Sequence, residues 1–338
     1  MSSQNPEPAS GKLDIEAGIK ETGRLVQAAL NGPSQSRHPY GLGGLTAYLA
    51  QGAGKGMRTR VLLSSAMDGG GGVPPNAPKA AAAVELLHMA TLVHDDVIDD
   101  ADTRRGRTTL HKEFGNKNAI LCGDYLLSIS MTTLAGMELG AELGIETRGH
   151  LAVRFAKALA SICQGEYSQH VHNRNVDLPM LSYLRVIAGK TAALFYVSAF
   201  MGALLGGESE DAALALGSFG RQLGMAFQIA DDCKDYGLGE DGAQKPVGSD
   251  LKNGVVTLPL ILALRKTPAL RKQAQAVMLH EADAAVFLAR VRNAKGTEMA
   301  LGVARRFEKK AARILAGVSA HKREALLAIL HSVMPKSA

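Results

Sequence analysis

Apolar residues recur at intervals of three and four along most of the chain, which is the spacing of one face of an α-helix. Near the start, Ile19, Leu25, Val26 and Leu30 show this pattern. Similar patterns occupy residues 84–92, 116–138, 151–170, 181–205, 211–236, 254–266, 283–292 and 298–317. The strict alternation typical of strands is scarce. The chain is therefore predicted to be all-α, with roughly ten or more helices.

Breaker residues separate these helical segments without dividing the chain into two parts. They lie at 69–75, 177–179, 206–207 and 237–246, and no fixed-period repeat or Pro-rich linker occurs. We therefore expect one domain over residues 13–338. Residues 1–12 are rich in Ser, Pro, Gln and Asn, and are predicted to be a disordered tail.

Two segments, 80–94 and 191–205, are apolar on nearly all sides. Such helices belong in the interior, where a charged residue is costly and therefore informative. The longest uncharged run, about 192–205, is shorter than the roughly 20 residues that span a bilayer. It predicts a buried core helix and no transmembrane segment.

Composition limits the class of protein. The chain has 338 residues, 46% of them hydrophobic and 21% charged, which excludes a disordered or fibrous protein. Cys122, Cys163 and Cys233 are widely spaced, which argues against a disulfide scaffold or a zinc ribbon. With no signal peptide at the start, these features favour the cytoplasm. The net charge of +6 suits nucleic acid, an anionic membrane or phosphorylated small molecules, so placement must decide.

Two acidic clusters each end an apolar helical segment. Asp95, Asp96 and Asp99 end the first, and Asp231, Asp232 and Asp235 end the second; each set reads DDxxD. Carboxylates one helical turn apart share a face and repel unless a cation lies between them. Mg²⁺ prefers such oxygen ligands, and a diphosphate would complete the metal shells. A solvated acidic turn is the simpler explanation for one copy, but two copies favour a metal–diphosphate site.

Basic residues near these clusters suit the same ligand. Arg104 and Arg105 follow the first cluster, Lys190 opens the most apolar segment, and Lys245 follows the second cluster. Residues 54–58, GKGMR, add a cationic pair beside flexible backbone. The Gly-Lys there does not fit a P-loop, because the GxxxxGK[ST] pattern fails.

These residues resemble the trans-isoprenyl (polyprenyl) diphosphate synthase family, in its medium- and long-chain, octaprenyl-like form. The resemblance covers roughly residues 40–320. It rests on GKxxR at 54–58, HDDxxDxxxxRRG at 94–106, HKEFGN and AILCGDYLL at 111–127, GKT at 189–191, FQxxDDxxD at 227–235 and KPVGSDLxxGxxTLP at 245–259. It implies an isoprenoid synthase bundle of helices around a deep central cavity. It also implies a homodimer that joins isopentenyl diphosphate head-to-tail to an allylic diphosphate, all-trans, with about three Mg²⁺ ions.

The resemblance assigns roles residue by residue. Six carboxylates are implied as metal ligands or their supports: Asp95, Asp96, Asp99, Asp231, Asp235 and Asp250. The implied catalytic set is Asp95, Asp96, Asp99, Arg104, Lys190, Asp231, Asp232 and Lys245. The implied substrate-binding set is Lys55, Arg58, His88, Arg104, Arg105, Lys190, Thr191, Gln228 and Lys245. The implied chain-length tunnel is lined by Val84, Leu87, Ala90, Thr91, Leu127 and Met131, and its small residues indicate a longer product.

The chain departs from the family pattern at a few positions. Gly56 stands where an Arg is usual, Thr59 where a Pro is usual, Gln244 where a Gly is usual, and Val255 where a Lys is common. Val255 removes one candidate diphosphate contact.

Several alternatives stay open from the sequence. They are a shorter-chain farnesyl or geranylgeranyl diphosphate synthase, and a partner subunit of a heteromeric synthase. A terpene cyclase is disfavoured by the absence of Trp and by the second DDxxD. A nucleic-acid-binding protein would need clustered cations such as 305–313, which fit a solvated helix face better. A transient membrane contact for product release also stays open.

Overall fold

The computed structural model describes residues 12–32, 42–52, 56–137, 145–237 and 248–335. The all-α prediction is confirmed, and the sheet in these ranges is one hairpin, β1 (Thr103–Arg104) with β2 (Arg107–Thr108). The first helices are α1 (Ile15–Asn31), α2 (Gly43–Ala50), α3 (Met57–Ala66), α4 (Ala77–Ile98), α5 (Leu110–Phe114), α6 (Asn116–Ala135) and α7 (Ile145–Val171). Then come α8 (Met180–Ile187), the π-helix η2 (Ala188–Ala192), α9 (Ala193–Leu205), α10 (Glu210–Lys234) and α11 (Ser249–Lys252).

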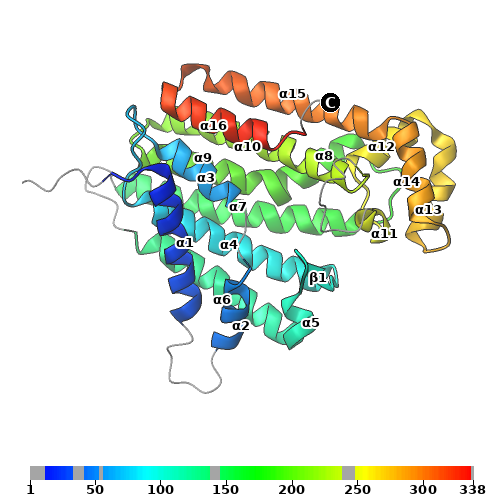
Figure 1. Ribbon diagram of the computed structural model, residues 1–338, viewed down its shortest axis with the longest axis horizontal. Helices are drawn as coiled ribbons and strands as arrows, with labels where there is room; N and C mark the ends of the chain where they lie inside the picture. Colours follow the sequence, from blue (N-terminus) through cyan, green and yellow to red (C-terminus); the bar gives the residue numbers. More distant parts are fainter. Residues whose placement is uncertain (1–11, 33–41, 53–55, 138–144, 238–247, 336–338) are drawn as a thin grey trace, which may run out of the picture.

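The chain ends in a further run of helices. These are α12 (Leu258–Lys266), the 3₁₀ turn η3 (Pro268–Leu270), α13 (Arg271–Met278), α14 (Ala284–Asn293), α15 (Gly296–Ile314), the 3₁₀ turn η4 (Leu315–Gly317) and α16 (Ala320–Ser332). In Figure 1, α15 and α16 form one edge, α7 and α10 run through the middle, and α4 and α6 lie toward the opposite edge. Helices α11, α13 and α14 gather at one end.

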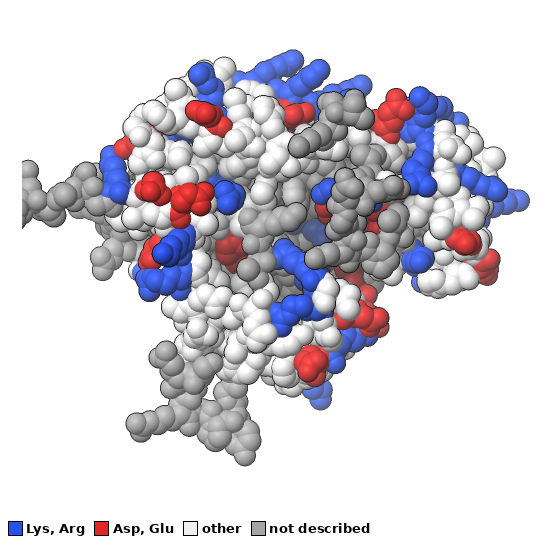
Figure 2. Space-filling model, viewed as in Figure 1, with Lys and Arg blue, Asp and Glu red and all other residues white. Residues whose placement is uncertain are grey.

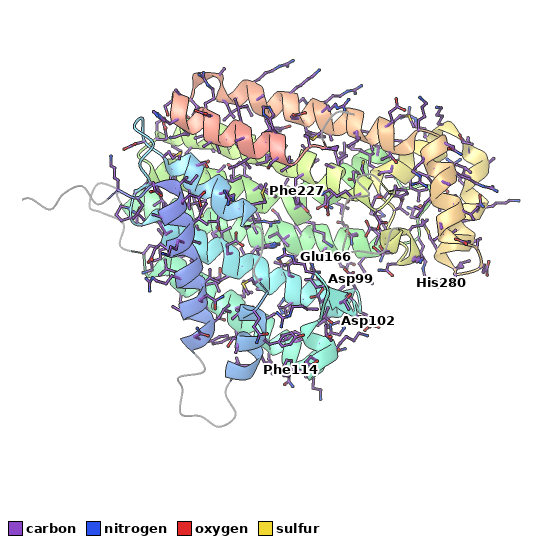
Figure 3. All side chains as sticks on the ribbon, viewed as in Figure 1. Asp99, Asp102, Phe114, Glu166, Phe227 and His280 are labelled. Carbon is purple, nitrogen blue, oxygen red and sulfur yellow. The ribbon has the colours of Figure 1, made fainter. Side chains whose placement is uncertain are left out.

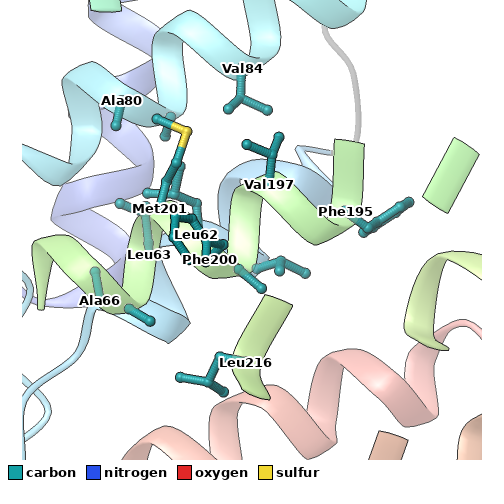
Figure 4. Close-up of a cluster of buried hydrophobic side chains, with 14 of the residues drawn as sticks. Leu62, Leu63, Ala66, Ala80, Val84, Phe195, Val197, Phe200, Met201 and Leu216 are labelled. Carbon is teal, nitrogen blue, oxygen red and sulfur yellow. The ribbon is translucent and has the colours of Figure 1, made fainter. Parts of the chain in front are cut away.

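The largest hydrophobic core surrounds α9. Leu62 of α3, Val84 of α4 and Leu216 of α10 meet Phe200 and other apolar side chains of α9 there (Figure 4). The helices can approach closely because α9 carries Gly202, where a Cβ would lie only 2.1 Å from the Leu62 carbonyl oxygen. The expectation that 191–205 is interior is therefore confirmed for α9.

Two further cores complete the packing. One joins α8, α10 and the C-terminal helices α12 to α15 around Tyr183, Ile229 and Phe287. The other joins α1, α4 and α6 around Leu30, Leu86 and Leu126. The C-terminal ends of α4 and α10, where the acidic motifs lie, are thus anchored by different cores.

One continuous helical stretch, Met180–Leu205, is long and apolar enough to cross a membrane by length and composition alone. It comprises α8, η2 and α9, and 72% of its most apolar window is buried inside the protein. A core helix of a globular protein has the same properties, so this finding is weak support for a membrane span.

The cationic segment 305–313 lies on α15. Arg305, Arg306, Lys309 and Lys310 are exposed, while Ala304 and Ala311 are buried against the protein. Figure 2 shows Lys and Arg side chains projecting along the α15 edge of the molecule. This is the arrangement expected of a solvated amphipathic helix face.

Candidate active site

The first acidic motif lies where α4 ends and the hairpin begins. Asp96 is buried, and its Oδ1 accepts a hydrogen bond from Arg104 Nε at 2.7 Å. Lys112 neutralises the two outer carboxylates, with 2.8 Å to Asp100 and 3.1 Å to Asp102. Asp96 therefore holds Arg104 at the end of α4.

A tight turn directs the arginines after this motif. Arg105 and Gly106 connect the two hairpin strands, and both have positive φ, 53° and 76°. Two such residues are typical of a type I′ turn, which matches the twist of a hairpin. Glycine takes this conformation freely, whereas Arg105 takes it at a cost of about 1 kcal/mol or more. Arg104 is the last residue of β1, directly before this turn, and it reaches back to Asp96 at the end of α4.

Lys190 is placed by an irregular helix. Residues Ala188–Ala192 form the π-helix η2, a rare element that often occurs at functional sites. Lys190 Nζ lies 2.5 Å from Glu166 Oε2 of α7. Burial opposes its charge, but Asp95, Glu166 and Asp99 together outweigh this and raise the pKa of Lys190. Figure 3 shows Glu166 and Asp99 close together where α7 passes the end of α4.

Glu166 was not predicted from the sequence. It is 8% exposed, an unusual place for a carboxylate. The preceding Gly165 packs against η2 so closely that a Cβ there would lie 2.4 Å from the Lys190 amide nitrogen. The sequence signal for this pairing is a Gly-Glu pair within one helix, Gly165-Glu166, and a Gly-Lys pair within another, Gly189-Lys190. The two glycines allow the helix backbones to touch, and the adjacent charged residues can then form an ion pair.

Burial is the main influence on Asp95. It raises the pKa of Asp95 to about 7, with Lys190 opposing and Glu166 and Asp99 adding to the increase. The carboxyl therefore lies in a place where its negative charge is poorly solvated. A bound cation would remove this penalty.

The second acidic motif has divided roles. Asp231 is exposed and lies 3.1 Å from Lys234. Asp232 points inward, where its oxygens accept hydrogen bonds from Tyr183 Oη at 2.5 Å and Gln228 Nε2 at 2.7 Å. Burial, with a smaller effect of Asp250, raises the pKa of Asp232 to about 8. Asp232 is therefore positioned to orient its neighbours.

A hydrogen-bond chain connects this motif to η2. Thr191 Oγ1 donates to Gln228 Oε1 at 2.7 Å, and Gln228 in turn donates to Asp232. Lys190 faces the first acidic motif, while the adjacent Thr191 is hydrogen-bonded to Gln228, which donates to Asp232 of the second motif. The π-helix therefore links the two motifs, which the sequence could not show.

Asp235 binds backbone as well. Its Oδ1 accepts from the amide and hydroxyl of Ser249, and its Oδ2 accepts from the amide of Asp250 at 3.1 Å. These bonds join the end of α10 to the start of α11, across residues that the structure does not describe. Asp250 is thereby brought close to Asp232, which fits the supporting position predicted for both Asp235 and Asp250.

A separate cationic cluster surrounds His88. Burial is the main reason that the pKa of His88 lies well below its usual value, and Arg58, Arg105 and Arg104 add to the effect. Burial likewise lowers the pKa of Arg58 to about 10. The Arg58 guanidinium lies 4.8 Å from the centre of the Phe195 ring, and its buried Nε has no hydrogen-bond partner among the described residues. The structure thus brings together Arg58, His88 and Arg105, as predicted.

Two predicted binding residues, Lys55 and Lys245, lie outside the described residues, as does Gln244. Two departures from the family pattern have a structural reason. Gly56 precedes α3 with φ of 60°, which glycine adopts without strain. The amide and hydroxyl of Thr59 both donate to Glu85 Oε1, a pairing that a proline could not make.

The predicted tunnel residues do not share one surface. Val84 and Leu87 belong to the core around α9 and Ala90 belongs to the core of α1, α4 and α6, whereas the partly buried Leu127 packs against both cores. Thr91 is partly exposed on the same face of α4 as Asp95, one turn away. Met131 is 40% exposed on α6, so it does not line an enclosed tunnel within this chain. On α4, helical rotation separates the adjacent residues Ala90 and Thr91 by about 100°.

The donors at the acidic motifs suit a hard divalent cation. Asp95, Asp99 and Asp231 offer carboxylate oxygens, and the partly buried Asp95 has a destabilised negative charge that a cation would offset. Among the described residues no three carboxyl, His or Cys groups are already close enough to form a metal cluster. A metal would therefore be held with additional ligands such as substrate oxygens and water.

Comparisons with known proteins identify the family of this chain. The chain matches the Polyprenyl synthetase family over residues 41–291. The chain belongs to the polyprenyl synthetase family. It is 37% identical over 317 residues to heptaprenyl diphosphate synthase component 2 of Geobacillus stearothermophilus, covering 93% of this chain and 92% of that protein.

Solved polyprenyl synthases show the same fold. A decaprenyl diphosphate synthase from Rhodobacter capsulatus is 30% identical with a TM-score of 0.82, covering 94% of this chain and 96% of that one. A polyprenyl synthase from Caulobacter crescentus, complexed with calcium and isoprenyl diphosphate, is 28% identical with a TM-score of 0.81, covering 98% and 100%. The family predicted from the six motifs is therefore confirmed.

Proposed function

We propose that this polyprenyl synthetase is a trans-prenyltransferase that joins isopentenyl diphosphate to an allylic diphosphate, with a medium- or long-chain polyprenyl diphosphate as product. One observation carries the proposal. Lys190 from η2 meets carboxylates from α4 and α7, while a second cationic cluster of Arg58, His88 and Arg105 lies nearby. The diphosphate of the allylic substrate leaves during the reaction, and cations assist its departure. The diphosphate of isopentenyl diphosphate does not react, and it needs only a binding site that anchors it.

The chain's own residues would act mainly by electrostatics. Lys190 and Arg104 are held by Glu166 and Asp96, so they are already aimed where charge grows on the departing diphosphate. Such preorganised charges stabilise an ionising C–O bond more than freely moving ones do. Arg58, His88 and Arg105 would hold isopentenyl diphosphate so that its double bond faces the allylic carbon. The proton lost at the end would pass to the released diphosphate.

Magnesium is the proposed cofactor, with about three ions held by Asp95, Asp99 and Asp231 together with substrate oxygens. When bound, the ions would supply Lewis-acid stabilisation of the diphosphate. The calcium and isoprenyl diphosphate in the Caulobacter relative support this proposal. The product length is proposed from the relatives, whose names are heptaprenyl and decaprenyl diphosphate synthase.

The test is incubation with isopentenyl diphosphate, each allylic primer and Mg²⁺, followed by chromatography of the product. We expect a long polyprenyl diphosphate, and loss of at least 1,000-fold of the rate in Asp95→Ala and in Asp231→Ala, because each removes a proposed metal ligand. Lys309→Ala, an exposed α15 cation, is the matched control. Absence of product with every primer would refute the proposed activity for this chain alone.

We also propose a homodimer. Helix α7 carries an exposed apolar stripe: Val153 is 50% exposed, Tyr167 is 70% and Val171 is 58%. On α6, Leu121 is 57% and Met131 is 40% exposed. Exposed apolar side chains gathered on a surface often mark a protein interface. Light scattering should give twice the chain mass, and Tyr167→Glu should give the monomer mass.

One relative is named component 2, which favours a heteromeric assembly as the competing arrangement. A monomer that becomes active only with a second, different chain would support it against the homodimer. We further propose a cytoplasmic location, because Cys122, Cys163 and Cys233 are all free thiols.

A further inference from the structure

A cavity of about 700 Å³ lies away from the site described above. It runs between α7 on one side and α8, η2 and α9 on the other, and Arg221 of α10 completes its wall. We call this cavity the outer groove. Neither Lys190 nor Glu166 lines it, and none of the acidic-motif residues does. Its volume lies in the range of pockets that hold small molecules.

The outer groove is strongly cationic. Arg154, Lys157, Arg185 and Arg221 line it, and no Asp or Glu is among its lining residues. Within the described ranges, Lys157, Arg185 and Arg221 make no ion pair within 4.0 Å. Like charges gathered around one cavity repel one another, so an anion in the groove would be stabilised by several of them at once.

Arg154 is already held in place. Its Nη1 donates to the Tyr196 hydroxyl oxygen at 3.0 Å, and its guanidinium carbon lies 4.3 Å from the centre of the Phe200 ring. Its Nη2 lies 3.5 Å from Glu210, a half-exposed carboxylate at the start of α10. A guanidinium fixed in this way loses little freedom when it binds an anion.

The floor of the groove is made of backbone and small side chains. Gly165 of α7 and Gly189 of η2 lie there, where the two helices are in contact. Hydroxyl groups of Ser161, Ser168 and Ser182 line the walls. Small residues let a ligand approach the floor, and hydroxyls donate to phosphate oxygens. These features suit a compact phosphorylated ligand better than a protein or nucleic-acid surface.

We propose that the outer groove is a second anion site, which binds a small phosphorylated molecule such as a diphosphate. The groove lining and the proposed prenyl transfer site share no described residue. Gly165 precedes Glu166, and Gly189 precedes Lys190, so the groove floor and the Lys190–Glu166 ion pair belong to the same two backbone segments. Lys157 at the rim adjoins the α7 stripe proposed for dimerisation, so the assembled protein is used for the test.

The test uses the fact that the chain has no Trp. Ser182→Trp places a single fluorophore in the groove wall, and inorganic diphosphate is titrated in the presence of EDTA. We expect a saturable fluorescence change, and a Kd at least tenfold weaker when Arg185→Ala and Arg221→Ala are added. Arg185→Lys should retain binding, which separates loss of charge from loss of fold.

Matched controls locate the signal. Arg305→Ala removes an exposed cation on α15 and should leave the Kd unchanged, and Leu279→Trp, just after α13, should give no response. The proposal would be overturned if Ser182→Trp gives no fluorescence change with diphosphate. It would also be overturned if the change persists after both arginine substitutions. A response to anionic phospholipid vesicles without one to free diphosphate would also overturn it, because the ligand would then be a membrane surface. Prenyl transfer is measured separately, so this result does not depend on the proposed function.

Discussion

A single methyl group added at Gly165 tests whether backbone contact between α7 and η2 positions Lys190. In Gly165→Ala the new Cβ would lie 2.4 Å from the Lys190 amide nitrogen and 3.0 Å from its Cα, whereas ordinary contacts begin at 3.4 Å. Because the neighbouring atoms are backbone, η2 must move by about 1 Å. Lys190 Nζ would move away from Glu166 and from the diphosphate position.

The expected loss follows from that displacement. A misplacement of about 1 Å costs roughly 100-fold in rate, which is about 2.7 kcal/mol of transition-state stabilisation. Overpacking alone destabilises by about 1–3 kcal/mol, offset by about 1 kcal/mol because Ala favours a helix more than Gly does. Activity should therefore fall much more than stability, which is measured by steady-state kcat/KM and by urea unfolding.

Gly149→Ala is the matched control on the same helix. A Cβ there meets nothing within 4 Å, so the substitution should leave kcat/KM unchanged and stabilise the protein slightly. If Gly165→Ala keeps wild-type kcat/KM while folding normally, the claim that the α7–η2 contact positions Lys190 is wrong.

Three further predictions concern residues of α7 and α4. Glu166→Gln should lower kcat by about 10- to 100-fold with a smaller change in KM, because the ion pair with Lys190 is lost; Glu166→Asp should recover part of the rate, and an unchanged kcat would count against the pairing. Both Ala90→Phe and Thr91→Phe are expected to shorten the product. The effect should be larger for Thr91→Phe, because Thr91 lies on the same face of α4 as Asp95. Unchanged product length in both variants would rule out a tunnel along α4. Burial, and then the neighbouring arginines, lower the pKa of His88 and keep it neutral. The unfolded state therefore binds more protons than the folded state as pH falls below about 6.5, so the free energy of unfolding should fall between pH 7 and 5. Thermal unfolding should show this fall, and it should be less steep in His88→Asn.

Much of the fold could be read from local pattern. The spacing of apolar residues predicts the helices, because one buried face repeats every 3.6 residues whatever the helix packs against. The carboxylates at the ends of α4 and α10 were also predictable as a site, since charges at the end of an apolar helix are costly unless they have a partner. The hairpin after α4 was not predicted, because its strands are only two residues long each.

What the sequence by itself determined was the kind of chemistry: hard oxygen ligands, phosphate-binding cations and the family. Only the tertiary structure decided which partner each carboxylate binds. Asp96 accepts a hydrogen bond from Arg104, and Asp232 accepts hydrogen bonds from Tyr183 and Gln228. Glu166, which was not predicted, forms an ion pair with Lys190. The tertiary structure also separated Ala90 from Val84 and Leu87. The reason is physical: residue type and helical period are local properties, whereas an ion pair between residues 166 and 190 depends on how closely two helices approach. Here two glycines set that approach.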